Sequence, residues 1–126
     1  MAWGSDTSLG TTLTTVDNAT EEFIPASGGI SLNPGETAHV QLGIDNESGS
    51  VTDAVEIRIY TTLDATSEDW DEIAWQTFTV LPTVITEVDY SFLVSGCYKF
   101  RVGILSAGAT DVYTVNGQYR VNGISI

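Results

Sequence analysis

Apolar and polar residues alternate along three stretches of the chain. The stretches read TAHVQLGID at 37–45, AVEIRIYTTL at 54–63 and YKFRVGIL at 98–105. Successive side chains of a β-strand point to opposite faces of a sheet, so a period of two predicts strands with one buried and one wet face. The residues predicted to face the core are Ala38, Val40, Leu42, Ile44, Val55, Ile57, Ile59, Tyr98, Phe100, Val102 and Ile104.

Further strands and turns extend this pattern. Short apolar runs predict strands near 23–24, 29–32, 74–81, 87–94, 111–115 and 118–126. Asn33-Pro34-Gly35-Glu36 favours a turn, because proline presets φ and glycine accepts a positive φ. Asn116-Gly117 is typical of tight hairpins and separates the last two predicted strands. We predict an all-β fold without helices: a single antiparallel β-sandwich of about eight strands, jelly-roll-like or, alternatively, immunoglobulin-like.

The start of the chain differs from the rest in composition. Residues 1–20 are rich in Ser, Thr and Gly and carry scattered apolar residues, among them Trp3. We predict an extended N-terminal arm at 1–20 and a β-sandwich domain at 21–126, since 126 residues is the usual length of one domain. Such an arm could add a strand to a neighbouring molecule's sheet edge; the alternative is a disordered tail.

The chain is strongly acidic. It has 17 Asp and Glu against 4 Lys and Arg, a formal net charge of −13 at pH 7. Such a surface repels phosphates and anionic lipid headgroups, so we expect neither nucleic acid nor membrane as a partner. The cations occupy polar-facing strand positions, where we favour cross-strand pairing with acids over a basic binding patch. They are Arg58, Lys99, Arg101 and Arg120.

The cysteine content and the lack of targeting signals bear on where the protein folds. Cys97 is the single cysteine, which excludes an internal disulfide and a cysteine-based zinc site. The N-terminus has neither the basic start nor the apolar core of a signal peptide, and no apolar run is long enough to span a membrane. We expect a soluble protein made in a cytoplasm.

Five carboxylates lie close together in LDATSEDWDEIAWQTFTV, at 63–80. They are Asp64, Glu68, Asp69, Asp71 and Glu72. Clustered carboxylate oxygens could hold calcium, but their spacing matches no calcium loop and no glycine is present to wrap the chain round an ion. Paired acids could also serve a glycosidase, although a domain of this size offers little cleft. We favour a solvated loop and expect no metal.

Residue types that support other catalytic mechanisms are scarce. His39 is the only histidine and lies on the wet face of its predicted strand, so it is poorly placed for a catalytic triad. Cys97 has no flanking histidine or cation that would lower its pKa. No glycine cluster precedes a helix, which excludes a phosphate-binding loop. We expect no enzyme and no cofactor.

Exposed aromatic rings suggest a different function, because they mark binding surfaces and can stack on sugars. The candidates are Tyr60, Trp70, Trp75 and Tyr113. Trp75 shares a strand face with Ile73 and Thr77, opposite to Phe78, and would be exposed unless a bulge turns it inward. The alternative for these rings is burial, with Trp70 covering one end of the core.

Three segments together resemble a known family. They are SLNPGETAHVQL at 31–42, EIRIYTTLDATSEDWDE at 56–72 and SGCYKFRVGILSAGATD at 95–111. The run is similar to small β-sandwich proteins encoded among the structural genes of tailed phages and prophages. The similarity covers about residues 28–110 and is one of pattern, without a diagnostic catalytic or ligand motif. Ala65 and Thr66 stand where Gly-Gly is common in that family, so a different loop shape is expected.

The resemblance implies a non-enzymatic virion structural protein. Characterised proteins of that kind are capsid decoration or cement proteins, often trimers, so the implied partners are the major capsid protein and further copies of this chain. The implied location is the capsid surface of a virion assembled in the host cytoplasm. The alternative function is a carbohydrate-binding or adhesin module, and a calcium-dependent module is a third. The residues expected to contact a partner or ligand are Trp3, Tyr60, Asp69, Trp70, Asp71 and Trp75.

Overall fold

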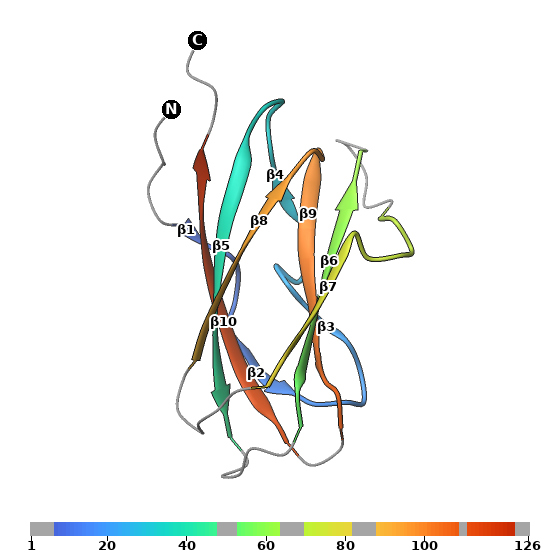
Figure 1. Ribbon diagram of the computed structural model, residues 1–126, viewed down its shortest axis with the longest axis vertical. Helices are drawn as coiled ribbons and strands as arrows, with labels where there is room; N and C mark the ends of the chain where they lie inside the picture. The colour runs from blue at the N-terminus through green and yellow to red at the C-terminus, as the bar shows by residue number, and fades with distance from the viewer. Residues whose placement is uncertain (1–6, 48–52, 64–69, 82–87, 109–110, 123–126) are drawn as a thin grey trace.

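The computed structural model describes residues 7–47, 53–63, 70–81, 88–108 and 111–122. Within these ranges the chain forms ten strands and no helix, which confirms the all-β prediction (Figure 1). The strands are β1 (Thr7–Ser8), β2 (Leu13–Val16), β3 (Glu22–Ile24), β4 (Ile30–Ser31), β5 (Thr37–Asn46), β6 (Val55–Thr62), β7 (Gln76–Val80), β8 (Val88–Ser95), β9 (Lys99–Ser106) and β10 (Tyr113–Asn122). Over the same ranges there is accordingly no helix that could cross a membrane.

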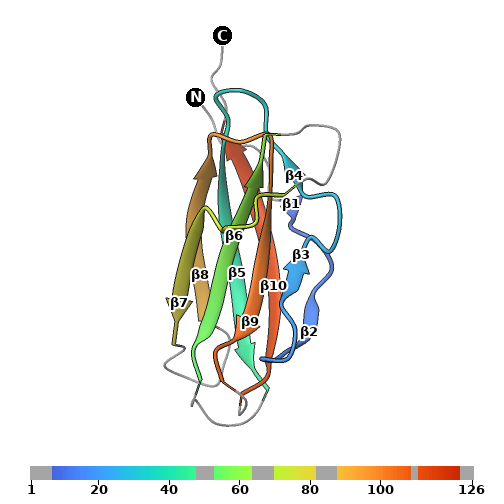
Figure 2. The same cartoon turned by 90° about the vertical axis from the view of Figure 1, so that its right-hand side faces the viewer.

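The strands form two antiparallel sheets that pack face to face as a sandwich (Figures 1 and 2). Sheet A has the order β1-β10-β5-β8, with β2 also paired to β10. Sheet B has the order β3-β9-β6-β7, with β4 also paired to β9. The pairs are nested along the chain: β1 and β2 pair with β10, β3 and β4 pair with β9, β5 pairs with β8, and β6 pairs with β7. A hairpin rolled up in this way is a jelly roll, the first of the two predicted topologies.

The alternation of the sequence locates the core correctly. Ten of the residues predicted to point inward have no exposed surface: Ala38, Val40, Leu42, Ile44, Val55, Ile57, Ile59, Phe100, Val102 and Ile104. The prediction for Tyr98 is wrong, because β9 begins only at Lys99 and Tyr98 lies in the preceding turn with 47% of its surface exposed. The inward faces of β5, β6 and β9 therefore supply most of the apolar layer between the sheets.

The prediction of a hairpin at Asn116-Gly117 is wrong. β10 runs through this dipeptide, where Asn116 pairs with Gly43 and Gly117 with Leu42 of β5. The carbonyl oxygen of Gly117 accepts a hydrogen bond from the Leu9 N–H at 2.9 Å, and a Cβ atom on Gly117 would lie 2.8 Å from Leu9 Cδ2. The glycine therefore allows the N-terminal segment to approach a strand closely, which is the usual meaning of glycine inside a strand.

The described part of the predicted arm, residues 7–20, is extended and is built into sheet A. β1 and β2 pair with β10 there, and β3, which pairs with β9 in sheet B, begins only at Glu22. Leu9 is 1% exposed and Val16 is completely buried. From residue 7 onward, the segment predicted as an arm therefore contributes side chains to the core.

A buried polar cluster joins the strands at the lower end of Figure 1. Asp111 is 1% exposed, and its Oδ2 accepts a hydrogen bond from the Asp53 N–H at 2.8 Å. Asp53 Oδ2 in turn accepts one from the Asp111 N–H at 2.9 Å. Asn46 Nδ2 and the Tyr113 hydroxyl also donate to Asp111 Oδ2, each at 3.3 Å, and the Tyr113 hydroxyl donates to the carbonyl oxygen of Asp53. Tyr113 is fully buried here, so it is not the exposed sugar platform that the sequence suggested.

The environment of Tyr113 is expected to make the fold less stable at alkaline pH. Burial, together with Asp111, raises the pKa of Tyr113 from 10.0 to about 12. Below pH 10 the phenol is neutral in both states; between about pH 10 and 12 the unfolded chain loses the proton first, so the free energy of unfolding falls as pH rises. Urea denaturation across this range should show a steeper loss for the wild type than for Tyr113→Phe. Parallel curves for the two proteins would contradict the assignment.

Candidate functional site

The outer face of sheet B carries a cluster of three rings around one cation. The guanidinium carbon of Arg101 lies 3.9 Å from the ring centroid of Phe23, 4.8 Å from that of Trp70 and 5.9 Å from that of Tyr60. Phe23 and Tyr60 also meet edge to face, with centroids 5.8 Å apart. Arg101 pairs with Tyr60 across β9 and β6, so the register of the sheet brings them to the same face. We call these four residues the sheet B cluster.

Trp70 reaches the sheet B cluster from the connection after β6. The Asp71 and Trp75 N–H groups donate to backbone oxygens of β6 at 3.2 and 2.8 Å, so this part of the chain runs back along the strand. The half-buried Trp70 ring lies over Gly29, where a Cβ atom would stand 2.5 Å from Trp70 Cη2. Gly29 also has a φ of +65°, so both space and backbone favour glycine at this position.

An acidic side chain borders the sheet B cluster but is already engaged. Both carboxylate oxygens of Glu21 accept hydrogen bonds from the Tyr60 hydroxyl, at 2.9 and 3.0 Å, and Oε2 lies 3.6 Å from Nη1 of Arg58. Arg58 Nε also donates to Glu56 at 2.9 Å, so this cation does pair with acids, but Glu56 lies on the same strand and not on a neighbouring one as predicted. Burial and the hydrogen bond to Glu21 raise the pKa of Tyr60. Gly103 leaves room for the carboxylate, since a Cβ atom there would lie 2.3 Å from Glu21 Oε2.

The residues expected to contact a partner have different environments. The Tyr60 hydroxyl is bonded to Glu21, the Trp70 ring is packed on sheet B, and Asp71 is exposed. Among the expected contact residues that the structure describes, Trp75 is the one that offers an open aromatic surface, with 46% of its surface exposed. Trp3 and Asp69 lie outside the described residues. Phe23 was not singled out from the sequence, because a single strand's pattern does not reveal its register against β9.

The acidic stretch that raised the question of calcium is only partly described. Its members Asp71 and Glu72 are exposed, whereas Asp64, Glu68 and Asp69 lie outside the described ranges. Within those ranges, no group of three or more His, Cys, Asp and Glu side chains is arranged to hold a metal ion.

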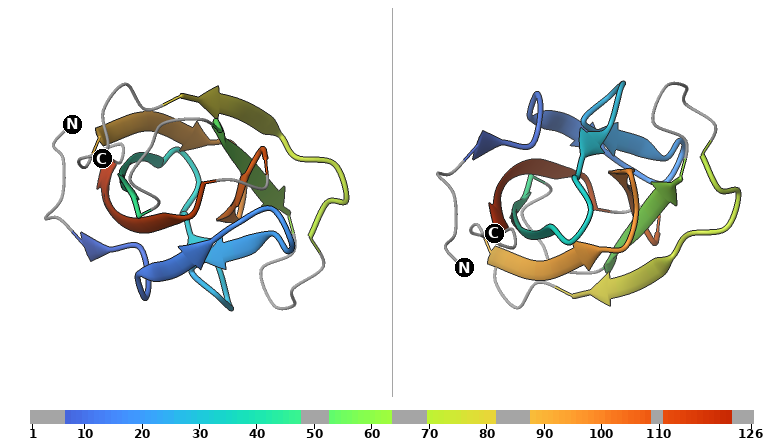
Figure 3. Two further views of the ribbon diagram at one scale, coloured as in Figure 1. Left: turned by 90° about the horizontal axis from the view of Figure 1, so that it is seen from below. Right: turned by 90° about the horizontal axis from the view of Figure 1, so that it is seen from above.

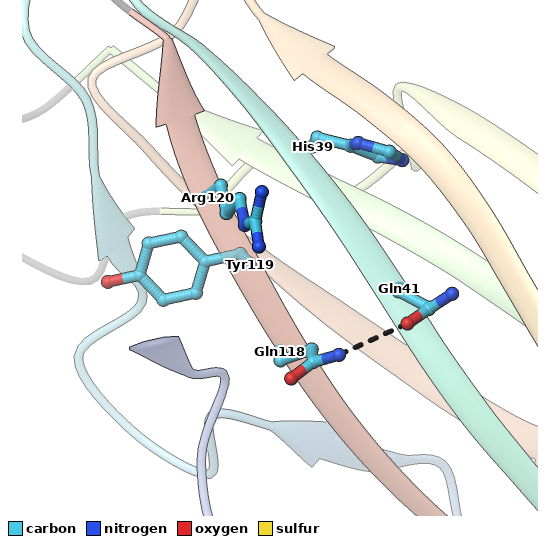
Figure 4. Close-up of a pocket in the computed structure, with 5 residues that line it drawn as sticks. All are labelled: His39, Gln41, Gln118, Tyr119 and Arg120. Carbon is cyan, nitrogen blue, oxygen red and sulfur yellow. Dashed lines mark hydrogen bonds between the residues drawn. The ribbon is translucent and has the colours of Figure 1, made fainter. Parts of the chain in front are cut away.

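A shallow depression of about 190 Å³ lies on the outer face of sheet A (Figure 4). Residues of β5 and β10 line it: His39, Gln41, Gln118, Tyr119 and Arg120, of which the Tyr119 side chain points away from the other four and packs against the core. Gln118 Nε2 donates to Gln41 Oε1 at 3.1 Å across the strand pair. His39 is exposed on this face, as its strand position predicted. The depression offers amide groups and a cation for hydrogen bonding, and the sequence did not reveal it because its residues come from paired strands far apart in the chain.

Cys97 lies beside an apolar hollow of about 170 Å³ at the upper end of the sandwich. Leu32, Pro34, Leu63 and Tyr98 contribute apolar surface to the hollow. The thiol is half-buried, and burial raises its pKa. A raised pKa keeps the sulfur in the neutral, weakly nucleophilic form at neutral pH.

One side of the sandwich presents two free strand edges. β7 and β8 lie side by side there (Figures 2 and 3), and among the described residues β7 pairs only with β6 and β8 only with β5. β7 reads QTFTV and contains neither a charge nor a proline, and β8 reads VDYSFLVS with Asp89 as its one charge. Phe78 of β7 lies 5.6 Å from Tyr90 and 5.8 Å from Phe92 of β8, between ring centroids, so aromatic packing fixes the two edges relative to each other. We call this the open side.

The opposite side of the sandwich is blunted. Its edges are formed by β1, β2, β3 and β4, which have only two, four, three and two residues. Very short edge strands are one of the means by which proteins prevent pairing with another chain, as are lysines and prolines on the edge. The protein therefore protects one side of its sheets and leaves the longer edges of β7 and β8 available.

Comparisons with known proteins give no family. No known family matches the sequence, and no curated protein matches it. Solved structures that match include a chain from the disulfide-linked pili of Bacillus endospore appendages, with a TM-score of 0.49 and 16% identity over 96% of this chain and 88% of that chain. They also include the CBM22-1 xylan-binding domain of Paenibacillus barcinonensis Xyn10C, with a TM-score of 0.47 and 10% identity over 96% of this chain and 86% of that chain. A likeness at this level carries no argument about function.

Proposed function

We propose that the protein is a non-enzymatic structural subunit that assembles with further copies of itself through the open side. The observation that carries this proposal is the pair of free edges on β7 and β8, beside the short strands that blunt the other side. A free strand edge presents a row of unpaired N–H and C=O groups that a second chain can satisfy by adding a strand. Leu93, 57% exposed on β8, adds apolar surface for such a contact.

Charge opposes this assembly and sets how it depends on salt. Each copy carries a net charge of −13, so two copies repel one another at low ionic strength. At physiological salt the Debye length is about 8 Å, which screens most of this long-range repulsion. Association through the free edges is therefore expected to strengthen as salt is added.

Lysines on the free edges should prevent association. Thr79→Lys on β7 places the cation opposite Glu56, and Ser91→Lys on β8 places it opposite Gln41, so both variants should fold while charging an edge. Light scattering at several protein concentrations should show an oligomer for the wild type and at least about tenfold weaker association for each variant, equivalent to ~1.4 kcal/mol.

The matched control is Thr14→Lys, an exposed position of β2 on the blunted side. It adds the same charge to the chain without touching the open side, so it should keep the wild-type mass. A wild type that stays monomeric at every concentration and salt would overturn self-assembly. Equal weakening by all three lysines would show that net charge, and not the open side, controls association.

For the larger structure to which the subunit contributes, we propose the surface of a phage capsid, with the major capsid protein as the partner and a trimer as the assembled form. The support is the sequence resemblance to phage structural proteins, together with the jelly-roll order, which is common in viral capsid proteins and in lectins alike. A fold alone does not fix a function, so the test is direct binding. Purified protein should co-sediment with capsids that lack a decoration protein, and failure to do so would contradict this location.

A second candidate function is carbohydrate binding on sheet A. The specific observation is the depression with the hydrogen-bonded pair Gln41 and Gln118, whose amides can donate to and accept from sugar hydroxyls. Glycan screening by calorimetry, followed by Gln118→Ala with Trp75→Ala as a comparison, would locate any binding. Loss with Gln118→Ala alone would support the depression, and loss with Trp75→Ala alone would move the site to the exposed tryptophan.

A further inference from the structure

Two hydrogen-bond donors in the sheet B cluster lack acceptors within the described part of the chain. Nε of Arg101 and Nε1 of Trp70 are both buried, and no described residue accepts a hydrogen bond from either. On this face Arg58 forms ion pairs with Glu21 and Glu56, whereas Arg101 forms no ion pair with any residue that the structure describes. A buried charged donor without an acceptor is unfavourable, so such groups in native proteins usually mark a site that something else completes.

Among the residues that the structure describes, no carboxylate forms an ion pair with Arg101, which is unexpected in so acidic a chain. Acidic residues outnumber basic ones by 17 to 4, and Arg58 on the same face contacts both Glu56 and Glu21. Glu21, which borders the cluster, is occupied by the Tyr60 hydroxyl and by Arg58. Arg101 instead lies against aromatic rings, which attract the guanidinium through their faces while leaving its in-plane N–H groups to other partners.

The surroundings define the kind of group that would fit. An arginine guanidinium is planar and presents its donors as a fork that matches the two oxygens of a carboxylate. The indole N–H of Trp70 adds a further donor in the same cluster, since the two groups are 4.8 Å apart from guanidinium carbon to ring centroid. A net charge of −13 disfavours a doubly charged anion, so a singly charged carboxylate is the better match. Both side chains keep partial exposure, whereas the two donor atoms themselves are buried, so a carboxylate reaches them only when these side chains shift.

We propose that Arg101 and Trp70 form a binding site for a carboxylate group, presented as an Asp or Glu side chain by a second copy of the chain. Charge complementarity supports this source, because each copy carries 17 acidic residues, while three of its four cations lie on β6 and β9 of sheet B. The choice of a second copy as the source of the carboxylate rests on the self-assembly proposed above. The existence of a carboxylate-binding site at Arg101 and Trp70 does not depend on self-assembly.

The site can be tested on the isolated protein with sodium acetate as the probe. In nitrogen-detected NMR spectra, the Arg101 Nε–H and Trp70 Nε1–H signals should shift saturably with acetate, and not with sodium chloride at the same ionic strength. Arg101→Lys keeps the charge but loses the fork, and should weaken acetate binding about tenfold. Trp70→Phe keeps a ring but removes the indole donor, and should weaken it less.

Arg120→Lys is the matched control, because it makes the same change on the outer face of sheet A. It should leave the acetate titration unchanged. Equal shifts with chloride, or equal weakening by Arg101→Lys and Arg120→Lys, would overturn the site. The folded state of each variant is checked by its amide spectrum, so a loss of binding cannot be mistaken for unfolding.

The source of the carboxylate is tested with two larger probes. Hexaglutamate, which stands for an acidic protein segment, should bind more tightly than acetate and compete with it. If trigalacturonate binds more tightly than hexaglutamate, the carboxylate comes from an acidic glycan and not from a protein. Arg101→Lys should also weaken self-association, whereas it should leave the edges of β7 and β8 intact. If the wild type binds acetate but never associates, self-assembly fails while the carboxylate site stands; if it associates without binding acetate, the site fails alone.

Discussion

Replacing Leu9 by alanine is expected to lower the free energy of unfolding by about 2–5 kcal/mol, the cost of removing a large buried aliphatic side chain from a packed core. Leu9 is 1% exposed, and its Cδ2 fills the space above Gly117 of β10. Alanine keeps the backbone hydrogen bond from the N–H of residue 9 to the Gly117 carbonyl oxygen, so the loss of stability reports on the side chain. Urea denaturation followed by tryptophan fluorescence gives the value.

Leu63→Ala is the matched control for this prediction. It removes the same atoms from a side chain that is 73% exposed, so it should change stability by less than about 0.5 kcal/mol. Similar stability of Leu9→Ala and Leu63→Ala would mean that the N-terminal segment is detached in solution. In that case residues 7–20 would be an arm, free to pair with another molecule.

Asp111→Ala is expected to cost about 2–4 kcal/mol, because each buried polar group left without its partner costs about 1–3 kcal/mol. The carboxylate accepts hydrogen bonds from the Asp53 N–H, from Asn46 and from the Tyr113 hydroxyl, and it is 1% exposed. Alanine cannot replace these acceptors. The substitution removes one of the two hydrogen bonds between Asp53, just before β6, and Asp111, just before β10; the bond from the backbone N–H of residue 111 to Asp53 remains.

Two comparisons make this prediction decisive. Asp71→Ala removes an exposed carboxylate and should lie within about 0.5 kcal/mol of the wild type. Asp111→Asn keeps the size of the side chain and one oxygen acceptor, so it should fall between the wild type and Asp111→Ala. An alanine variant as stable as the wild type would show that water satisfies these donors and that the cluster does not hold the strands together.

The sequence predicted the fold class and the core of the longest strands, because a period of two along 37–45, 54–63 and 98–105 reports directly which side chains point inward. It failed at Asn116-Gly117, where a dipeptide with strong local preference for a hairpin lies inside β10. Pairing with β5 on one side and contact with Leu9 on the other override that preference. Neither contact can be inferred from the residues next to Gly117.

The candidate sites depend on register, which the period of a single strand does not contain. Arg101 was expected to pair with an acid, and the prediction of a polar-facing position was right, but its neighbours are Phe23, Tyr60 and Trp70. Those rings come from β3, β6 and the connection after β6, and only the alignment of three strands brings them together. The sequence left both exposure and burial open for Trp75; it is 46% exposed and lies one residue before β7, so its exposure does not follow from a strand face.

The position of β10 in sheet A also has consequences during synthesis. Of the described strands it is the last to be translated, yet it lies between β5 and the strands nearest the N-terminus, and Thr7 pairs with Tyr119. On the ribosome, β1, β2 and one edge of β5 therefore remain unpaired until β10 has been translated. Folds dominated by such distant pairings form slowly and expose apolar surface while they wait, so a nascent chain arrested before residue 113 would need a chaperone to stay unaggregated.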